Sequence, residues 1–88
     1  MNIFLLDSNI KKCAQYHCDK HVVKMILESA QILSTVLRLN GVDQGYKTTH
    51  ANHPCTLWAG KSFSNWKWLR ELASALNKEY RFRLRFYS

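Results

Sequence analysis

The three cysteines of this chain form no Cys-x-x-Cys motif and are odd in number. Such a set does not build the disulfide framework of a small secreted domain, and it fits a reducing compartment. The four histidines and three cysteines also lack the two tight ligand pairs of a structural zinc site, so we expect no metal and no other cofactor. The sequence therefore predicts a domain that is stabilised by an apolar core alone.

Long apolar runs are missing as well. The apolar segment 3–6 ends at Asp7 and is much too short for a signal peptide or a membrane span. We therefore expect a soluble cytoplasmic protein with no membrane partner. No glycine-rich phosphate loop, Ser/His/Asp triad or paired carboxylate site is visible, which leaves nucleotide hydrolysis and glycan chemistry without support.

Acidic residues are scarce, with six Asp and Glu against thirteen Lys and Arg, for a net charge of +7. The imbalance is concentrated in residues 45–88, which carry eight basic and two acidic residues, whereas residues 1–44 carry five and four. A polyanion is the partner that such asymmetry favours, and nucleic acid is the first candidate. The alternative is a basic protein whose charge only keeps it in solution.

The longest helical pattern covers residues 19–39, with Asp19 in its first turn and Asn40-Gly41 as a left-handed stop. At about 100° per residue, apolar side chains cover well over half of its circumference. A helix of this kind is normally wrapped by the rest of its domain. The sequence therefore predicts an all-α fold, a compact three-helix domain around this central buried helix.

One narrow polar stripe interrupts the apolar surface of this helix. Its members recur at alternating spacings of three and four residues, with Lys20 and Arg38 beside them: His21, Lys24, Glu28, Gln31 and Thr35. The stripe is either a solvated strip, with Lys24 and Glu28 as an ordinary exposed pair, or a site in which nearby cations favour the ionised Glu28 carboxylate. Periodicity leaves both interpretations open.

Shorter elements complete a single helical domain over residues 1–88. The expected elements are an N-terminal arm at 1–7, further helices at about 9–16, 54–59 and 62–80, and a basic tail at 81–88. Pro54 suits the first position of the third helix, with Asn52 or His53 as its cap. His53 either only caps this helix or also helps its free N–H groups to receive a phosphate.

The last long helix separates apolar from basic residues. One face carries Trp66, Leu69, Leu72, Ala73, Leu76 and Tyr80, and the opposite face carries Lys67, Arg70, Ser74, Lys78 and Arg81. We expect the first face to pack on the central helix and the second to follow a phosphate backbone without reading its sequence. Trp68 lies at the boundary and either packs or offers a platform on which a base stacks.

The tail at 81–86 alternates arginine with apolar residues. In a strand, Arg81, Arg83 and Arg85 would share one side, and such a strand could pair with residues 2–6. A helix would scatter these arginines. Because aromatic residues stand beside the arginines, this segment is the most nucleic-acid-like of the chain.

The spacing Asp19-x-His21, followed after six residues by Glu28, resembles the phage-type pyrimidine-dimer DNA glycosylases, the endonuclease V family. In that family a similarly placed Asp-x-His opens a helix on which a glutamate is catalytic. Related small proteins add a basic stretch on this helix, a His-Pro turn, a Trp-bearing short helix and an aromatic-rich last helix. The matching features here are Lys20 to Gln31, His53-Pro54, Trp58 and Trp66 to Glu79, so that the resemblance spans about residues 14–80.

The resemblance implies a DNA glycosylase and AP lyase that acts on damaged or modified pyrimidines, encoded by a phage and located in the cytoplasm of its bacterial host. Its N-terminal α-amine would attack the sugar C1′ and form an imine before strand cleavage. Glu28 would help to expel the base, with His21 and Lys24 lining the site and Lys20 contacting the nucleic acid.

Two alternatives stay open, because Leu27 and Ser29 replace the arginine-rich positions beside the family's glutamate. One is a basic DNA- or RNA-binding module without chemistry. The other is a phage protein that uses exposed aromatic residues to bind a protein partner or another copy of itself.

Overall fold

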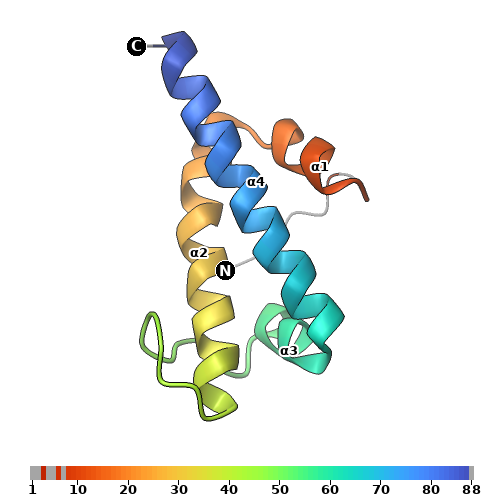
Figure 1. Cartoon of the computed structure of the whole chain (residues 1–88), viewed down its shortest axis with the longest axis vertical. Coiled ribbons are helices and arrows are strands. Elements are labelled where there is room, and N and C mark those ends of the chain that lie inside the picture. The colour runs from red at the N-terminus through yellow and green to blue at the C-terminus, as the bar shows by residue number, and fades with distance from the viewer. Residues whose placement is uncertain (1–2, 4–5, 7, 88) are drawn as a thin grey trace.

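Four helices make up the described part of the chain, which in this computed structural model consists of residues 3, 6 and 8–87. They are α1 (Ile10–Tyr16), α2 (Asp19–Leu39), α3 (Pro54–Lys61) and α4 (Phe63–Tyr87), shown in Figure 1. No strand occurs in these residues, so the predicted all-α class is confirmed. The expected arm at 1–7 falls mostly outside them. Over the same residues, no helix combines the length and the apolarity needed to cross a membrane.

Helix α4 runs through the tail, for which the sequence left both a strand and a helix open. It spans 25 residues and ends at Tyr87, so the described part of the tail is helical and not a strand. Two local causes favour the helix: residues 63–87 contain no glycine or proline, and Arg83 Nε donates to Glu79 Oε1 one turn earlier at 2.9 Å. The expected pairing with residues 2–6 involves positions that lie mostly outside the described residues.

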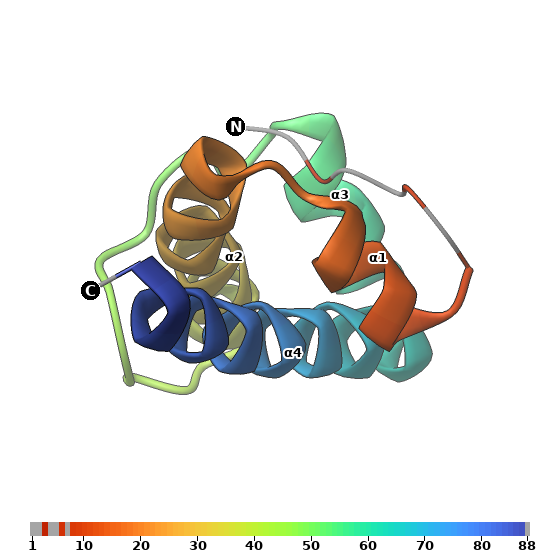
Figure 2. The same cartoon turned by 90° about the horizontal axis from the view of Figure 1, so that it is seen from above.

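Helix α4 packs against each of the other three helices, which all lie on one side of it (Figures 1 and 2). Its residues Leu69, Leu72 and Leu76 are completely buried, as the apolar face predicted for this helix requires. Helix α2 is not the central buried helix that we expected, because Val23 and Leu27 on it are 55% and 47% exposed. In so small a chain the remaining helices cannot cover α2 on all sides.

Backbone hydrogen bonds fix the end of α2. Gly41 has a φ of +85°, and the N–H groups of Gly41 and Val42 donate to the carbonyls of Arg38 and Leu37 at 3.0 and 2.9 Å. These are the two bonds of a Schellman motif, which needs a left-handed residue just after the cap. The stop predicted at Asn40-Gly41 thus has a backbone mechanism, and it turns the chain into the loop that leads to α3.

Candidate functional site

His21, Lys24 and Glu28 share one face of α2. His21 and Glu28 are half-buried, whereas Lys24 is exposed. Helix α4 lies across the other side of α2, where Trp66 Nε1 of α4 donates to the Leu33 carbonyl of α2 at 3.2 Å. At about 100° per residue, Glu28 lies about 140° around the helix from Leu33. The fold therefore presents the three predicted catalytic residues on a surface that α4 does not cover.

Thr35, the last member of the polar stripe, is completely buried. Its hydroxyl donates to the Thr49 carbonyl and accepts from the Thr49 N–H, both at 3.1 Å. Glu28 precedes Thr35 on the same face by about two turns, or roughly 10 Å along the axis. The loop between α2 and α3 thus crosses this face of α2 and bounds the stripe at its C-terminal end.

Two histidines stand where this loop enters α3. His53 caps the helix, and because its Nδ1 accepts the Cys55 N–H at 3.1 Å, the neutral ring carries its proton on Nε2. His50 has a φ of +51°, an uncommon left-handed value for a residue with a side chain. The two rings meet edge to face with centroids 6.4 Å apart. The capping role predicted for His53 is therefore present, and it fixes the ring at the start of α3.

Arg38 ties the first half of the same loop to α2. Its Nε and Nη2 donate to the carbonyls of Tyr46 and Gly45 at 2.7 and 2.8 Å, and its Nη1 pairs with the Asp43 carboxylate. Gly45 has a φ of +75°, and a Cβ at this position would collide with Ser34 Oγ of α2. Only glycine suits both the conformation and the close approach, so this position fixes the course of the loop along the helix.

Arg83 of α4 holds the junction between α1 and α2 at the opposite end of the stripe. Its Nη1 pairs with Asp19 Oδ1 at 2.9 Å, and its Nη2 donates to the Gln15 carbonyl at 3.0 Å. The Arg83 side chain is only 15% exposed. We predicted this arginine as a nucleic-acid contact, but the fold uses its guanidinium internally. No local sequence signal announces the contact, because Asp19 and Arg83 are 64 residues apart.

The basic face predicted for α4 lies on another side of the molecule. Its exposed cations are Lys67, Arg70, Lys78 and Arg81, joined by Arg85 from the tail. Leu69 and Leu76 on the other face of α4 are buried, and the three remaining helices lie on that side of α4 (Figure 2). Because Glu28 faces away from α4, these cations and the predicted catalytic residues do not converge on one site.

Two of the predicted nucleic-acid contacts do lie near the stripe. Lys20 is exposed and stands one turn before Lys24, on the same side of α2. His53 follows the loop segment that Thr35 binds. Lys20 thus lies on the side of α2 that carries Lys24, and His53 lies where the loop that contacts Thr35 enters α3.

Trp68 packs rather than standing open on the surface. It is half-buried, and its ring meets that of Trp58 of α3 edge to face with centroids 6.1 Å apart. It also packs against the buried core. Of the two interpretations of Trp68, packing is the one that these contacts support.

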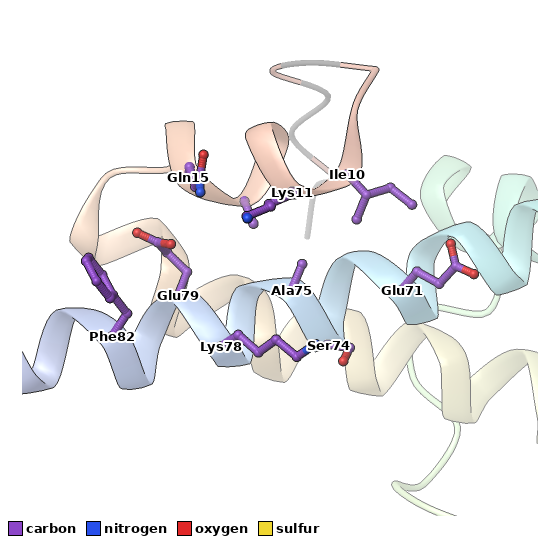
Figure 3. Close-up of a pocket in the computed structure, with 10 residues that line it drawn as sticks. Ile10, Lys11, Gln15, Glu71, Ser74, Ala75, Lys78, Glu79 and Phe82 are labelled. Atoms are coloured by element: carbon purple, nitrogen blue, oxygen red, sulfur yellow. The ribbon is translucent and has the colours of Figure 1, made fainter.

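A surface hollow of about 750 Å³ lies between α1 and α4, beside their contact (Figure 3). Ile10 of α1 and Ala75 and Phe82 of α4 give it an apolar lining, and Lys78 and Glu79 add charged groups. No residue of α2 lines it. It is therefore separate from the face that carries Glu28.

Across residues 3, 6 and 8–87, no three His, Cys, Asp or Glu side chains come together in a way that could hold a metal ion. His17 is buried at the C-cap of α1, where its Nδ1 donates to the Cys13 carbonyl at 2.6 Å. Among the described residues, Cys13, Cys18 and Cys55 form no disulfide bond.

Comparison with known protein families gives a match to the family described as pyrimidine dimer DNA glycosylase over residues 1–85. No curated protein and no solved structure matches the chain. The family match includes α2 with its stripe, the loop, α3 and nearly all of α4, and it confirms the resemblance inferred from Asp19, His21 and Glu28. The chain belongs to the pyrimidine dimer DNA glycosylase family, whose substrate is DNA.

Proposed function

We propose that this protein is a DNA glycosylase and AP lyase acting on damaged or modified pyrimidines, with Glu28 at its active site. The observation that carries the proposal is the position of Glu28. It is half-buried on an accessible face of α2, with Lys24 one turn and His21 two turns before it. Among the described residues Glu28 forms no ion pair, so no internal partner occupies its carboxylate.

The proposed chemistry begins with the N-terminal α-amine. Such an amine has an ordinary pKa of about 7.7–8.0, so a useful fraction is unprotonated at neutral pH. Its nitrogen attacks C1′ of the damaged nucleotide, the bond from C1′ to the base breaks, and the base leaves with a proton. The remaining amine proton passes to the ring oxygen O4′ as the bond from C1′ to O4′ breaks, which opens the sugar ring and leaves an imine between the protein and C1′.

Glu28 moves protons in the later steps. Its carboxylate accepts a proton from C2′ of the imine, the bond from C3′ to its phosphate oxygen breaks, and the strand is cleaved by elimination. Water then releases the sugar from the amine. Lys24 and Lys20 lie on the same face of α2, where their positive charges attract the approaching phosphates. In this proposal the imidazole of His53, at the end of the loop that enters α3, is a further contact to the DNA.

Borohydride trapping tests this proposal. The protein is mixed with a duplex of about 30 base pairs that contains one abasic site, borohydride reduces any imine to a stable amine, and the adduct is mapped by peptide mass analysis. We expect an adduct at the N-terminal amine. Glu28→Gln should lower strand cleavage by a factor of about 10²–10⁴ while leaving duplex binding unchanged.

Glu71→Gln is the matched control, because Glu71 is an exposed glutamate on α4. It should cleave like the unmodified protein. Binding without any adduct would favour the second candidate function, a DNA-binding module without chemistry. Equal cleavage by the Glu28→Gln and Glu71→Gln variants would remove Glu28 from the mechanism.

A further inference from the structure

The outward face of α4 carries a cation on almost every turn. We call this set the α4 ridge, and its members are Lys67, Arg70, Lys78, Arg81 and Arg85. All five side chains are exposed. From the first to the last, the ridge extends about 27 Å along the helix axis. A strand of duplex DNA presents a phosphate about every 3.4 Å along its axis, so a straight ridge of this length spans roughly eight nucleotide steps.

The charges of the α4 ridge have no internal compensation. The ion pairs in the described residues join Arg38 to Asp43 and Arg83 to both Asp19 and Glu79. No ridge cation takes part in them. Neighbouring cations three or four residues apart on a helix repel each other and destabilise it. No ion pair among the described residues offsets this repulsion, whereas an external polyanion would be bound by the ridge.

An exposed aromatic group stands at the N-terminal end of the ridge. Phe63 is 73% exposed and stacks on Trp66, with ring centroids 6.5 Å apart and planes inclined by 20°. The guanidinium of Arg70 lies over the Trp66 ring, 5.7 Å from its centroid. This exposed aromatic surface adds apolar contact area at the end of the ridge, beside a cation that can hold a phosphate.

The ridge and Glu28 face opposite sides of the molecule. Leu69 and Leu76, on the face of α4 away from the ridge, are buried against the other helices, so the ridge points outward from the fold. Helix α2 meets α4 through Leu33, and Glu28 lies about 140° around α2 from that residue. A short duplex that lies on the ridge therefore cannot also place a nucleotide at Glu28.

We propose that the α4 ridge binds the phosphate backbone of a second duplex DNA segment, so that one protein molecule holds two segments at once. This proposal rests on the proposed function, because the duplex segment bound at Glu28 is the first of the two. The ridge has no built-in contact that reads a base, so it binds undamaged DNA of any sequence. A protein of this kind keeps hold of one duplex segment while its other face tests a neighbouring one.

Counting duplexes per protein molecule tests the proposal. The probe is a labelled, undamaged duplex of about ten base pairs, which is too short to reach both faces. Its stoichiometry is measured at low salt by sedimentation velocity with the duplex in excess. The ridge variant carries Lys67→Gln, Lys78→Gln and Arg81→Gln. The control variant carries Lys11→Gln, Lys12→Gln and Lys61→Gln, three exposed lysines outside the ridge that give the same loss of charge.

We expect two duplexes on the unmodified protein and on the control variant, and one on the ridge variant. One duplex on the unmodified protein and none on the ridge variant would keep the ridge as a DNA site and overturn instead the DNA contact at Glu28. An unchanged stoichiometry in the ridge variant overturns the ridge. So does an equal loss in both variants, because binding would then follow net charge alone.

Salt dependence provides a second readout. The logarithm of the binding constant for duplex DNA changes with the logarithm of salt concentration by about 0.9 for each phosphate contact. Removing three ridge cations should therefore reduce the steepness of that dependence by about 3, and the control variant should leave it unchanged. An equal reduction in both variants, or none in either, would contradict the proposal. A preference of at least tenfold for a duplex RNA of the same length would replace DNA with RNA as the partner of the ridge.

Discussion

The guanidinium of Arg83 and the carboxylate of Asp19 join the last turns of α4 to the first residue of α2, at an N–O distance of 2.9 Å. The same guanidinium binds the Gln15 carbonyl at the end of α1 and the Glu79 carboxylate within α4. It therefore fixes three helices at the point where the stripe with Glu28 begins. Asp19 belongs to the motif that carries the family resemblance, and in the structure its carboxylate forms this ion pair with Arg83.

Arg83→Met should destabilise the fold by about 1–3 kcal/mol, because it removes bonds to a carbonyl and two carboxylates from a side chain that is mostly buried. Asp19→Asn should cost only about 0.5 kcal/mol, since that carboxylate is 70% exposed and screened by water. Urea unfolding of the two variants and of the double variant measures the coupling between them. A double variant whose cost equals the sum of the single costs would show that the pair contributes nothing.

Thr35→Val should destabilise the protein by about 1–3 kcal/mol, because the half-buried Thr49 N–H and carbonyl would both lose their partner. Thr35→Ser keeps the hydroxyl and should cost less. Thr48→Val, at an exposed position of the same loop, is the matched control and should be neutral within about 0.5 kcal/mol. Midpoints of urea unfolding decide the order. Similar midpoints for the Val and Ser variants at position 35 would count against an anchoring hydroxyl.

Gly45→Ala should cost more than Gly41→Ala. Both glycines have positive φ values, so alanine at either position pays about 1–2 kcal/mol for the left-handed conformation. A Cβ at Gly41 meets nothing within 4 Å, whereas one at Gly45 collides with Ser34. Combining Gly45→Ala with Ser34→Ala should recover part of the difference. Thermal unfolding compares these three variants with the unmodified protein. Equal melting temperatures for the two single glycine variants would disprove the close contact.

Exchange of His53 separates its capping role from any role at DNA. His53→Ala should lose about 1 kcal/mol of stability, because the Cys55 N–H loses its acceptor, while His53→Asn should keep the cap. If the imidazole acts at DNA, both variants should cleave abasic DNA about tenfold more slowly despite their different stabilities. Cleavage that falls only in the Ala variant would assign His53 to the cap alone.

Local patterns predicted much of the fold. The stop at Asn40-Gly41, the cap at His53 and the buried face of α4 each depend on neighbours within one or two turns, and such signals are present in the sequence. The pattern of the tail did not decide between a helix and a strand, because strict alternation of arginine and apolar residues is compatible with a strand. The pair of Arg83 with Glu79 and the uninterrupted helix before it decided for the helix.

The candidate site was only partly visible in the sequence. His21, Lys24 and Glu28 belong to one helix, so their common face follows from helical spacing alone. The buried Thr35 looked like a further member of the stripe, because its partner Thr49 comes from a loop whose path no local rule gives. Arg83 looked like a DNA contact for the same reason, since its partner Asp19 is distant in sequence.

The sequence by itself determined the helical class, the family, the basic charge and the row of groups that includes Glu28. All of these follow from composition, short motifs and periodicity within single helices. Only the tertiary structure decided that the other three helices all pack on α4, that Arg83 is used internally and that the cations of α4 face away from Glu28. These properties depend on how helices pack across long separations in the chain. Packing sets the relative rotation of two helices, which no periodicity within either one contains.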